Sequence, residues 1–434
     1  MRYAKYRSTG IAWLPEVPEE WEMRPLKTWF KSTFSGSWGK DVSSGETGVV
    51  CYRMADFDYE HGILSDDKLT FRSYKSSELE GKLLLAGDLL IEKSGGGDAS
   101  PVGRVVRVVS SRQATCSNFI QQVRCGGEVD SSFSCYIFSV LYARRMTKYF
   151  FNQTTGIQNL KVSRYLSLKV PFPPLSTQRA IVAYLDEKCG KVDRLVAAKE
   201  KETALLKELK QSMIAEAVTR GVRSKRRLVP SGIPWLPEVP EGWEMKRAKY
   251  LFQKEQRPVR AGDEIVTCFR DGEVTLRKNR RISGFTEATD YSHYQHICVG
   301  DLVIHQMDAF AGSCGVSNSD GMGTPVLSVC TPKNDRLDVR YFAAVVRLMG
   351  LNGFIQSLYR GIRERSSDFR FETFAKQVLP VPSLAEQREI VAYIEVRAAK
   401  IDAAVKGLER EVAALKEYKQ RLIADVVTGQ RKVA

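Results

Sequence analysis

Apolar residues recur every seven positions in two long stretches of the chain. In the second stretch, the repeated positions hold Ile394, Ile401, Leu408, Leu415 and Leu422. In the first stretch, they hold Leu185, Val192, Leu206 and Met213, and Lys199 stands where the second stretch has Leu408. This period predicts a long α-helix with one apolar stripe in each stretch. Each helix should cover roughly 40–45 residues, or about 60–68 Å at 1.5 Å per residue.

A single long helix with one apolar stripe is poorly stable in water, so each stripe needs a partner. We expect the two stripes to pair as an antiparallel coiled coil. Separate packing of each helix on its own domain is the alternative. Prolines precede both helices, and Gly221 and Gly429 follow them, as start and stop signals do. At Lys199 we expect a break in the apolar burial, because a polar residue in such a seam commonly fixes the register.

Outside these stretches, short runs of apolar and β-branched residues alternate with glycine-rich turns. The runs predict strands within residues 48–54, 82–93, 102–109, 264–269 and 300–307. Helix-like stretches follow at residues 136–151 and 341–350. The sequence therefore predicts an α+β protein with two mixed α/β domains and two long helices.

The chain carries this arrangement twice. Residues 9–23, TGIAWLPEVPEEWEM, recur as residues 231–245, SGIPWLPEVPEGWEM, with 12 of 15 positions identical. Residues 175–187, LSTQRAIVAYLDE, recur as residues 384–396, LAEQREIVAYIEV. GDLLI at residues 87–91 also matches GDLVI at residues 300–304, whereas the rest of each middle region diverges. Two domains that share a scaffold and differ in what they recognise would give this pattern.

The repeats set the expected domain boundaries. We expect a first recognition domain, a first repeated helix, a basic linker, a second recognition domain and a second repeated helix. Their ranges are 1–174, 175–221, 222–230, 231–382 and 383–430.

The charge of the chain favours a polyanionic partner. Lys and Arg number 66 against 51 Asp and Glu, a net charge of +15. Such an excess is typical of nucleic-acid binding, because each neutralised phosphate releases counterions. Residues 220–232, RGVRSKRRLVPSG, hold five positive charges and no negative one, as expected of a segment along a phosphate backbone or of a solvated linker.

The cysteines and the apolar runs indicate a cytoplasmic protein without a membrane partner. The nine cysteines are scattered and form no CxxC pair, which is typical of reduced thiols. No apolar run reaches the roughly 18 residues that a membrane helix needs, and the first residues hold no apolar signal core.

Catalytic motifs are absent from the sequence. It contains no GxxxxGK[ST] phosphate loop, no HExxH and no GxSxG. It also lacks the Asn/Asp-Pro-Pro-aromatic motif of adenine methyltransferases. His293 and His296 are three residues apart, but the segment around them is short, and we predict no metal there. We therefore expect a chain without catalytic residues, metal or cofactor.

The ordered set of repeats resembles the specificity subunit of type I restriction–modification enzymes over essentially the whole chain. The helices open with PPLSTQ at residues 173–178 and PSLAEQ at residues 382–387, and the domains open with a GxxWxxxxPxxW pattern. Residues 269–274, FRDGEV, and residues 300–317 are also similar to family segments. The resemblance implies that each domain reads one half of a split, asymmetric site in double-stranded DNA and that the helices set the gap.

The resemblance also implies partners. The helices and nearby domain surfaces would dock two methyltransferase (modification) subunits, which bind S-adenosylmethionine and flip and methylate adenine. Separate restriction/translocase subunits would use ATP and Mg to translocate and cut DNA. This chain itself would be non-catalytic.

Base recognition needs donors and acceptors on loops that reach the major groove. The polar segment 152–161 and the glycine turn after residue 93 are the candidates in the first domain, and the segment YRGIRERSSDFR with polar residues near the 269–307 region in the second. The predicted DNA contacts are Lys93, Ser94, Arg104, Gln158, Asn159, Lys161, Arg270, Arg277, Lys278, Gln306, Arg360, Arg363, Arg365 and Ser366.

Two other functions fit the same residues. One is the recognition subunit of a related multi-subunit enzyme that cuts outside its site. The other is a non-catalytic, structural coiled-coil protein whose basic domains bind DNA by shape, with equal affinity for all duplexes.

Overall fold

The chain folds into two compact units. The computed structural model describes residues 2–43, 47–110, 112–154, 156–224, 226–281, 283–284, 290–358 and 368–433. Residues 1–200 with 410–434 form the first unit, and residues 201–409 form the second. Each unit therefore combines one of the divergent regions with part of both long helices.

The first unit is built around a six-stranded sheet in the order β4-β13-β9-β11-β7-β6. Its strands are β4 (Phe30–Ser35), β13 (Ile120–Cys125), β9 (Leu89–Glu92), β11 (Val105–Arg107), β7 (Ile63–Leu64) and β6 (Phe57–Asp58). A three-stranded sheet comprises β12 (Ala114–Cys116), β5 (Val49–Tyr52) and β8 (Phe71–Arg72), and another comprises β10 (Ser94–Gly95), β15 (Ile157–Leu160) and β14 (Phe151–Thr154). Two-stranded pairs join β1 (Tyr6–Ile11) to β2 (Leu14–Pro18) and β16 (Lys169–Phe172) to β3 (Glu22–Pro25). The short helices are α1 (Ser76–Leu79), α2 (Ser131–Ala143) and α3 (Val162–Tyr165).

The second unit has a smaller central sheet in the order β20-β27-β24-β25. Its strands are β20 (Phe252–Lys254), β27 (Leu327–Pro332), β24 (Leu302–His305) and β25 (Cys314–Val316). Two-stranded pairs join β17 (Leu228–Ile233) to β18 (Leu236–Pro240), β19 (Glu244–Arg247) to β28 (Val378–Val381), β21 (Val266–Cys268) to β22 (Val274–Leu276) and β23 (Gln295–Ile297) to β26 (Gly321–Gly323). The short helices are α5 (Ala248–Leu251), α6 (Val339–Leu351), α7 (Phe354–Ser357) and α8 (Phe371–Phe374).

The GDLLI and GDLVI segments form the central strand of each unit. In β9, Leu89 and Ile91 pack into the apolar core beneath α2, whereas Leu90 packs into a second core on the other face of the sheet. In β24, Leu302 and Ile304 face the core beneath α6, and Val303 faces the second core. Because side chains alternate across a strand, a strand buried on both faces must be apolar at every position. This burial explains why the segment is repeated when its surroundings diverge.

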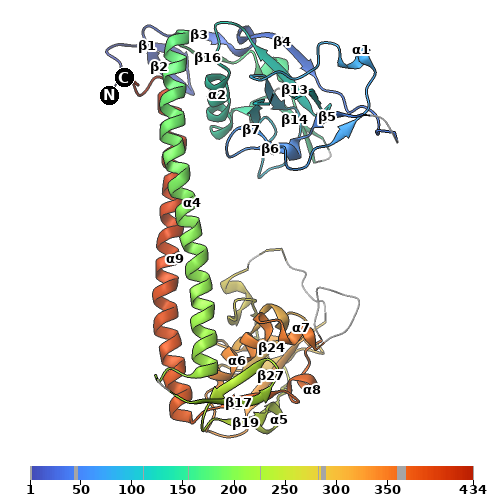
Figure 1. Ribbon diagram of the computed structural model, residues 1–434, viewed down its shortest axis with the longest axis vertical. Helices are drawn as coiled ribbons and strands as arrows, with labels where there is room; N and C mark the ends of the chain where they lie inside the picture. Colours follow the sequence, from blue (N-terminus) through green and yellow to red (C-terminus); the bar gives the residue numbers. More distant parts are fainter. Residues whose placement is uncertain are drawn as a thin grey trace. The chain divides into compact units, whose positions relative to one another are not determined.

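The two long helices are α4 (Leu175–Arg220) and α9 (Leu384–Val427), and in each unit their segments run side by side (Figure 1). Ion pairs show the direction of pairing. In the first unit, Lys419 binds Asp193 at 2.6 Å, and Lys416 binds Glu200 at 2.9 Å. As the position on α4 rises, the partner's position on α9 falls, so the helices are antiparallel.

In the second unit, the same two ion pairs recur at positions shifted by 209 residues. The lysines now lie on α4 and the acidic residues on α9. Lys210 binds Asp402 at 2.6 Å, and Lys207 binds Glu409 at 3.0 Å. The antiparallel pairing of the predicted α+β fold class is therefore confirmed. All the predicted seam residues are buried or half-buried. Leu185, Val192 and Leu422 are buried, and the half-buried ones are Leu206, Met213, Ile394, Ile401, Leu408 and Leu415.

Lys199 interrupts the apolar seam locally, as expected from the sequence. It is half-buried, and its ammonium group forms an ion pair with Glu411 on α9. The repeat would place Leu408 opposite Glu202 at the corresponding point of the second unit, so this ion pair has no counterpart there. The apolar seam of the first unit is thus interrupted by a polar side chain at Lys199.

Each unit takes its core from both helices. In the first unit, Ile181 and Leu185 at the beginning of α4 pack with Val426 and Val427 at the end of α9. In the second unit, Ile390 and Val391 at the beginning of α9 pack with Ala217 and Val218 at the end of α4, in the repeat-related arrangement. The helices therefore complete the domain cores in addition to pairing with one another.

The glycines predicted to stop the helices have left-handed backbone conformations. Gly221 has φ of 74° and Gly429 has φ of 75°. Such a conformation favours glycine and is the usual C-terminal cap of an α-helix. Beyond α9, the carbonyl of Gly429 accepts a 2.7 Å hydrogen bond from the Tyr6 hydroxyl, so the two described ends of the chain meet within the first unit (Figure 1).

Several segments differ in their bounds or their structure from the sequence-based prediction. The helix predicted at 136–151 is α2, which begins at Ser131 because the Asp130 side chain accepts from the backbone N–H groups of Ser132 and Phe133. It ends by Ala143, close to the positive φ of Arg145. The segment 152–161, predicted as a polar loop, is largely the β14–β15 hairpin. The last three residues of the predicted linker 222–230 lie in β17.

Candidate nucleic-acid interface

In the first unit, several predicted contact residues meet at the end of the central strand. Lys93 follows β9, and its ammonium group donates a 2.5 Å hydrogen bond to the Ser35 hydroxyl. Ser94 lies opposite Asn159 across the β10–β15 pair, and its hydroxyl donates to the Asn159 side-chain oxygen at 2.7 Å. The fold thus brings residues 93–94 and residue 159, far apart in sequence, to one surface.

Lys161 lies beside this surface. The backbone N–H of the preceding Leu160 donates to the Lys93 carbonyl at 2.8 Å, which places the two lysines on adjoining segments. Lys161 is exposed, and among the described residues its ammonium group has no hydrogen-bond or ion-pair partner. Its charge is therefore available to a phosphate.

Gln158 and Arg104, the remaining predicted residues of this unit, also have interactions within the protein. The Gln158 side chain is 1% exposed, and its oxygen accepts the backbone N–H of Val102 at 3.0 Å. The Arg104 guanidinium lies 3.4 Å from the centre of the Tyr59 ring and 3.4 Å from a carboxylate oxygen of Glu92. These interactions hold the Gln158 and Arg104 side chains in place within the first unit.

An apolar hollow that the sequence did not predict lies beside Lys93. It has a volume of about 430 Å³ and is lined by Trp38, Arg53, Met54, Ala55, Ser117, Asn118 and Phe119. Trp38 and Phe119 are partly exposed, and the Phe119 carbonyl accepts the Lys93 backbone N–H at 2.8 Å. Exposed aromatic rings next to cations suit contact with bases and thymine methyl groups. The only sequence signal was a polar Ser-Asn-Phe turn between two strands.

The second unit uses the equivalent position after its central strand. Gln306 occupies the place of Lys93, 213 residues further on, as the GDLLI and GDLVI segments align. The Gln306 carbonyl accepts the N–H of Phe369 at 3.0 Å, as the Lys93 carbonyl accepts that of Leu160. The Gln306 side-chain nitrogen donates to the Pro325 carbonyl at 3.2 Å. Equivalent points of the two domains thus carry a cation in one case and an amide in the other.

The described cations predicted in this unit are engaged with neighbours. Arg270 binds Asp308 at 2.9 Å, and Lys278 forms an ion pair with Glu264. Arg277 lies in a short 3-10 turn and also has an interaction partner. Arg360, Arg363, Arg365 and Ser366 lie outside the described residues.

His305 lies at the end of β24. Burial lowers the pKa of its imidazole, and the nearby Arg270 charge lowers it further, against the opposing effect of Asp308. Its Nδ1 accepts the backbone N–H of Asp308 at 3.1 Å, which the neutral ring allows. It therefore orders the turn that carries Asp308, the partner of Arg270.

No family model matches the sequence. Curated proteins do, among them the following two. The chain is 21% identical over 238 residues to the putative type I restriction enzyme MjaX specificity subunit of Methanocaldococcus jannaschii, which covers 53% of this chain and 52% of that protein. It is 24% identical over 286 residues to the type I restriction enzyme EcoBI specificity subunit of Escherichia coli, with 60% and 58% covered. The matches thus span just over half the length of these relatives.

Two solved structures share the fold over almost the whole chain. One comes from work on complex assembly and conformational transition of the type I R-M system, with a TM-score of 0.68, 17% identity, and 96% of this chain and 99% of the other covered. The other is the HsdS subunit of Thermoanaerobacter tengcongensis, with a TM-score of 0.51, 17% identity, and 96% and 98% covered. The resemblance to type I specificity subunits inferred from the repeats is confirmed. No helix in the described part of the chain is both long and apolar enough to cross a membrane.

Proposed function

We propose that this chain is the DNA sequence-specificity subunit of a type I restriction–modification complex. Each domain reads one half of a bipartite, asymmetric DNA site, and the paired helices set the spacer between the halves. The observation that carries the proposal is the repeated scaffold with different residues at equivalent surface positions, Lys93 in one domain and Gln306 in the other. Two domains with the same scaffold but different surface residues are suited to recognise two different half-sites.

In this proposal, the chemistry belongs to partner subunits. Two methyltransferase subunits bind S-adenosylmethionine and methylate adenine, and restriction subunits use ATP and Mg. Repeat-related apolar side chains on the helices support two docking positions. Leu209 on α4 and Tyr418 on α9 are related by the 209-residue repeat and are 56% and 49% exposed. Leu205, one turn before Leu209 on α4, is also exposed. Contiguous exposed apolar side chains mark interaction sites, whereas scattered ones are ordinary.

The docking positions can be tested one at a time. Tyr418→Asp should remove one methyltransferase subunit from the assembled complex, and Leu209→Asp should remove the other, as counted by native mass spectrometry. Gln211→Asp, an exposed polar position on α4, is the matched control and should keep both subunits. Retention of two subunits by both variants would contradict docking on these helix faces.

The function itself is tested by mapping methylated adenines in cells with and without this chain. The proposal expects one split motif to disappear when the chain is removed. Co-purifying subunits other than two methyltransferase subunits and ATP-dependent restriction subunits would favour the related enzyme that cuts outside its site. Unchanged methylation, together with equal affinity of the purified chain for all duplexes, would favour a structural DNA-binding protein.

A further inference from the structure

The second unit brings three metal-ligand side chains together at one end of the β23–β26 pair. Ile297 lies opposite Gly321 in this antiparallel pair, so the next positions outward place Cys298 opposite Asp320. His296 is two residues before Cys298 and therefore lies on the same face of the strand. One ligand atom from each of His296, Cys298 and Asp320 lies within 4.8 Å of the others.

The His296 ring is oriented and incompletely bonded. Its side chain is 1% exposed, and its Nδ1 lies 2.8 Å from a carboxylate oxygen of Asp263. Its Nε2 is buried and has no hydrogen-bond partner among the described residues. A histidine held by a carboxylate through one nitrogen, with the other nitrogen free, is the usual arrangement of a metal-binding imidazole. A buried nitrogen without a partner otherwise costs stability.

The Asp320 carboxylate also has an oxygen available for a metal ion. One Asp320 oxygen accepts the backbone N–H of Val299 at 2.8 Å, which leaves the second oxygen for a cation. Arg257, which interacts electrostatically with Cys298, is bound by Asp301 at 2.5 Å. Its charge is therefore compensated by a carboxylate outside the set.

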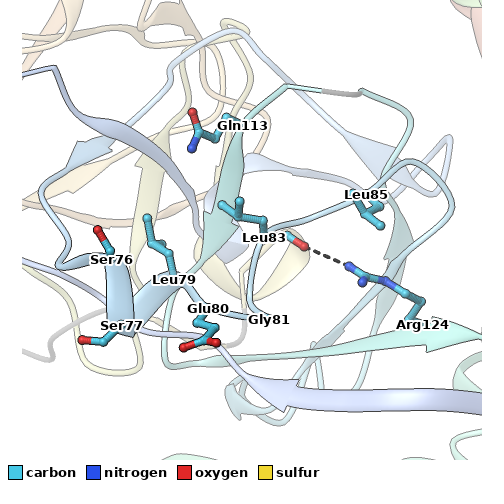
Figure 2. A pocket seen from close by; sticks show the side chains of 9 residues that line it. All are labelled: Ser76, Ser77, Leu79, Glu80, Gly81, Leu83, Leu85, Gln113 and Arg124. Atoms are coloured by element: carbon cyan, nitrogen blue, oxygen red, sulfur yellow. Dashed lines mark hydrogen bonds between the residues drawn. The ribbon is translucent and has the colours of Figure 1, made fainter.

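The first unit provides an internal comparison. Leu84 corresponds to Ile297, and its backbone meets Ala114 as that of Ile297 meets Gly321. The positions of His296, Cys298 and Asp320 are thus taken by Leu83, Leu85 and Gln113, which line the 650 Å³ pocket shown with Arg124 in Figure 2. The Arg124 guanidinium there donates to the Leu83 carbonyl at 2.9 Å. The ligand set is therefore a feature of the second domain and is not required by the scaffold.

We propose that His296 Nε2, Cys298 Sγ and an Asp320 carboxylate oxygen bind a zinc ion, with Asp263 orienting the imidazole. Nitrogen, thiolate and carboxylate are the protein ligands of zinc, and water can fill the fourth tetrahedral position. Zinc bonds of about 2.0–2.3 Å need only small side-chain rotations from the present separations. The ion would tie the turn before β24 to the connection between β25 and β26, and so fix the strand that leads to Gln306. Exposed His293 is not one of the ligands.

The test uses the full-length purified chain, stripped with chelator and then loaded with Zn²⁺ or Co²⁺. We expect one equivalent of zinc by elemental analysis and, with Co²⁺, a thiolate-to-metal charge-transfer band. Cys298→Ser should abolish the band, and Asp320→Asn, at an exposed position that should not disturb folding, should weaken binding at least 10-fold. Asp263→Asn should weaken it about 10–100-fold, as loss of an orienting carboxylate does.

His293→Ala and Gln113→Ala are the controls and should bind metal like the parent chain. Absence of zinc from the folded parent chain would overturn the proposal. So would unchanged affinity in Asp320→Asn, or a charge-transfer band that persists in Cys298→Ser. DNA binding is not part of the readout, so the zinc site can fail while the proposed function stands.

Discussion

Individual buried polar groups explain the short sequence signatures of this chain. Gln178, the last residue of PPLSTQ, is fully buried, and its oxygen accepts the Asp130 N–H at 2.9 Å. Its nitrogen donates to the carbonyls of Glu128 and Pro173. Gln387 makes the repeat-related bonds to Asp338, Arg336 and Pro382. The glutamine thus attaches the beginning of each long helix to the capped helix of its domain.

Replacement of this glutamine should destabilise its unit strongly. Gln178→Ala leaves one buried N–H and two carbonyls without a partner, at a cost of about 1–3 kcal/mol for each buried group that stays unpaired. Urea unfolding of the full chain measures the loss. Gln211→Ala, on the exposed face of α4, is the control. Equal stability of the two variants would show that Gln178 does not anchor the helix.

Residues of the candidate interface should divide into base contacts and phosphate contacts. Asn159→Ala should lower discrimination between the preferred half-site and a mismatched one by about 1–3 kcal/mol. Lys161→Ala should leave discrimination unchanged and reduce the slope of log K against log salt by about 0.9. Fluorescence anisotropy with labelled duplexes over a range of salt separates the two effects. If both variants keep the discrimination and the salt slope of the parent chain, these residues do not contact DNA.

Buried thiols predict alkaline instability. Burial raises the pKa of Cys116 in the first unit and of Cys268 in the second, each from about 9 to about 12. Because the unfolded thiols ionise first, stability is fully present below pH 9 and is lost as the pH rises toward 12. The loss of unfolding free energy between pH 8 and pH 10.5 should be smaller in a Cys116→Ala/Cys268→Ala variant than in the parent chain. An identical loss in both would assign the effect to other groups.

At the scale of elements, the repeat-related ion pairs select antiparallel pairing of α4 and α9. Asp193–Lys419 and Asp402–Lys210 stand at corresponding points of the two units. A parallel pairing would separate these partners. The apolar seam stabilises the association, and the charges specify its direction.

Reversal of one charge should therefore weaken pairing, and reversal of both should restore it. Lys419→Asp places two carboxylates together and should cost about 1 kcal/mol, somewhat less at high salt. The double variant Asp193→Lys/Lys419→Asp should recover most of that loss in thermal unfolding at low salt. Additive losses in the double variant would mean that the two side chains do not interact.

At the scale of the whole molecule, the duplication makes the beginning and the end of the chain depend on each other. Leu422, Val426 and Val427 lie in the core of the first unit, although more than 200 residues separate them from its remaining helix segment. The second unit, residues 201–409, contains all of its own core. Removal of the C-terminal segment should consequently affect the two units unequally.

A chain that ends at Tyr418 loses the four buried apolar side chains Leu422, Val426, Val427 and Val433 from the first core, each worth about 1.5–3 kcal/mol of burial. Hydrogen exchange should show loss of protection in β4, β9 and β13, while β24 and β27 keep theirs. A chain that ends at Val433, which keeps this last buried side chain of the first core, is the control. Uniform loss of protection in both units would contradict the assignment of these cores.

The sequence by itself determined the repeats, the two long helices, their apolar seam and the fold class. These follow from local periodicity and from identity between the halves, which need no knowledge of distant contacts. It located residues 93–94 and 159 as candidates but failed to separate exposed Asn159 from buried Gln158, because a hairpin and a loop share the same polar composition. Only the tertiary structure decided which side chains are buried, since burial depends on neighbours far away in the sequence. For the same reason, only it brought Cys298 opposite Asp320, set His296 against Asp263 and placed the end of α9 in the core of the first unit.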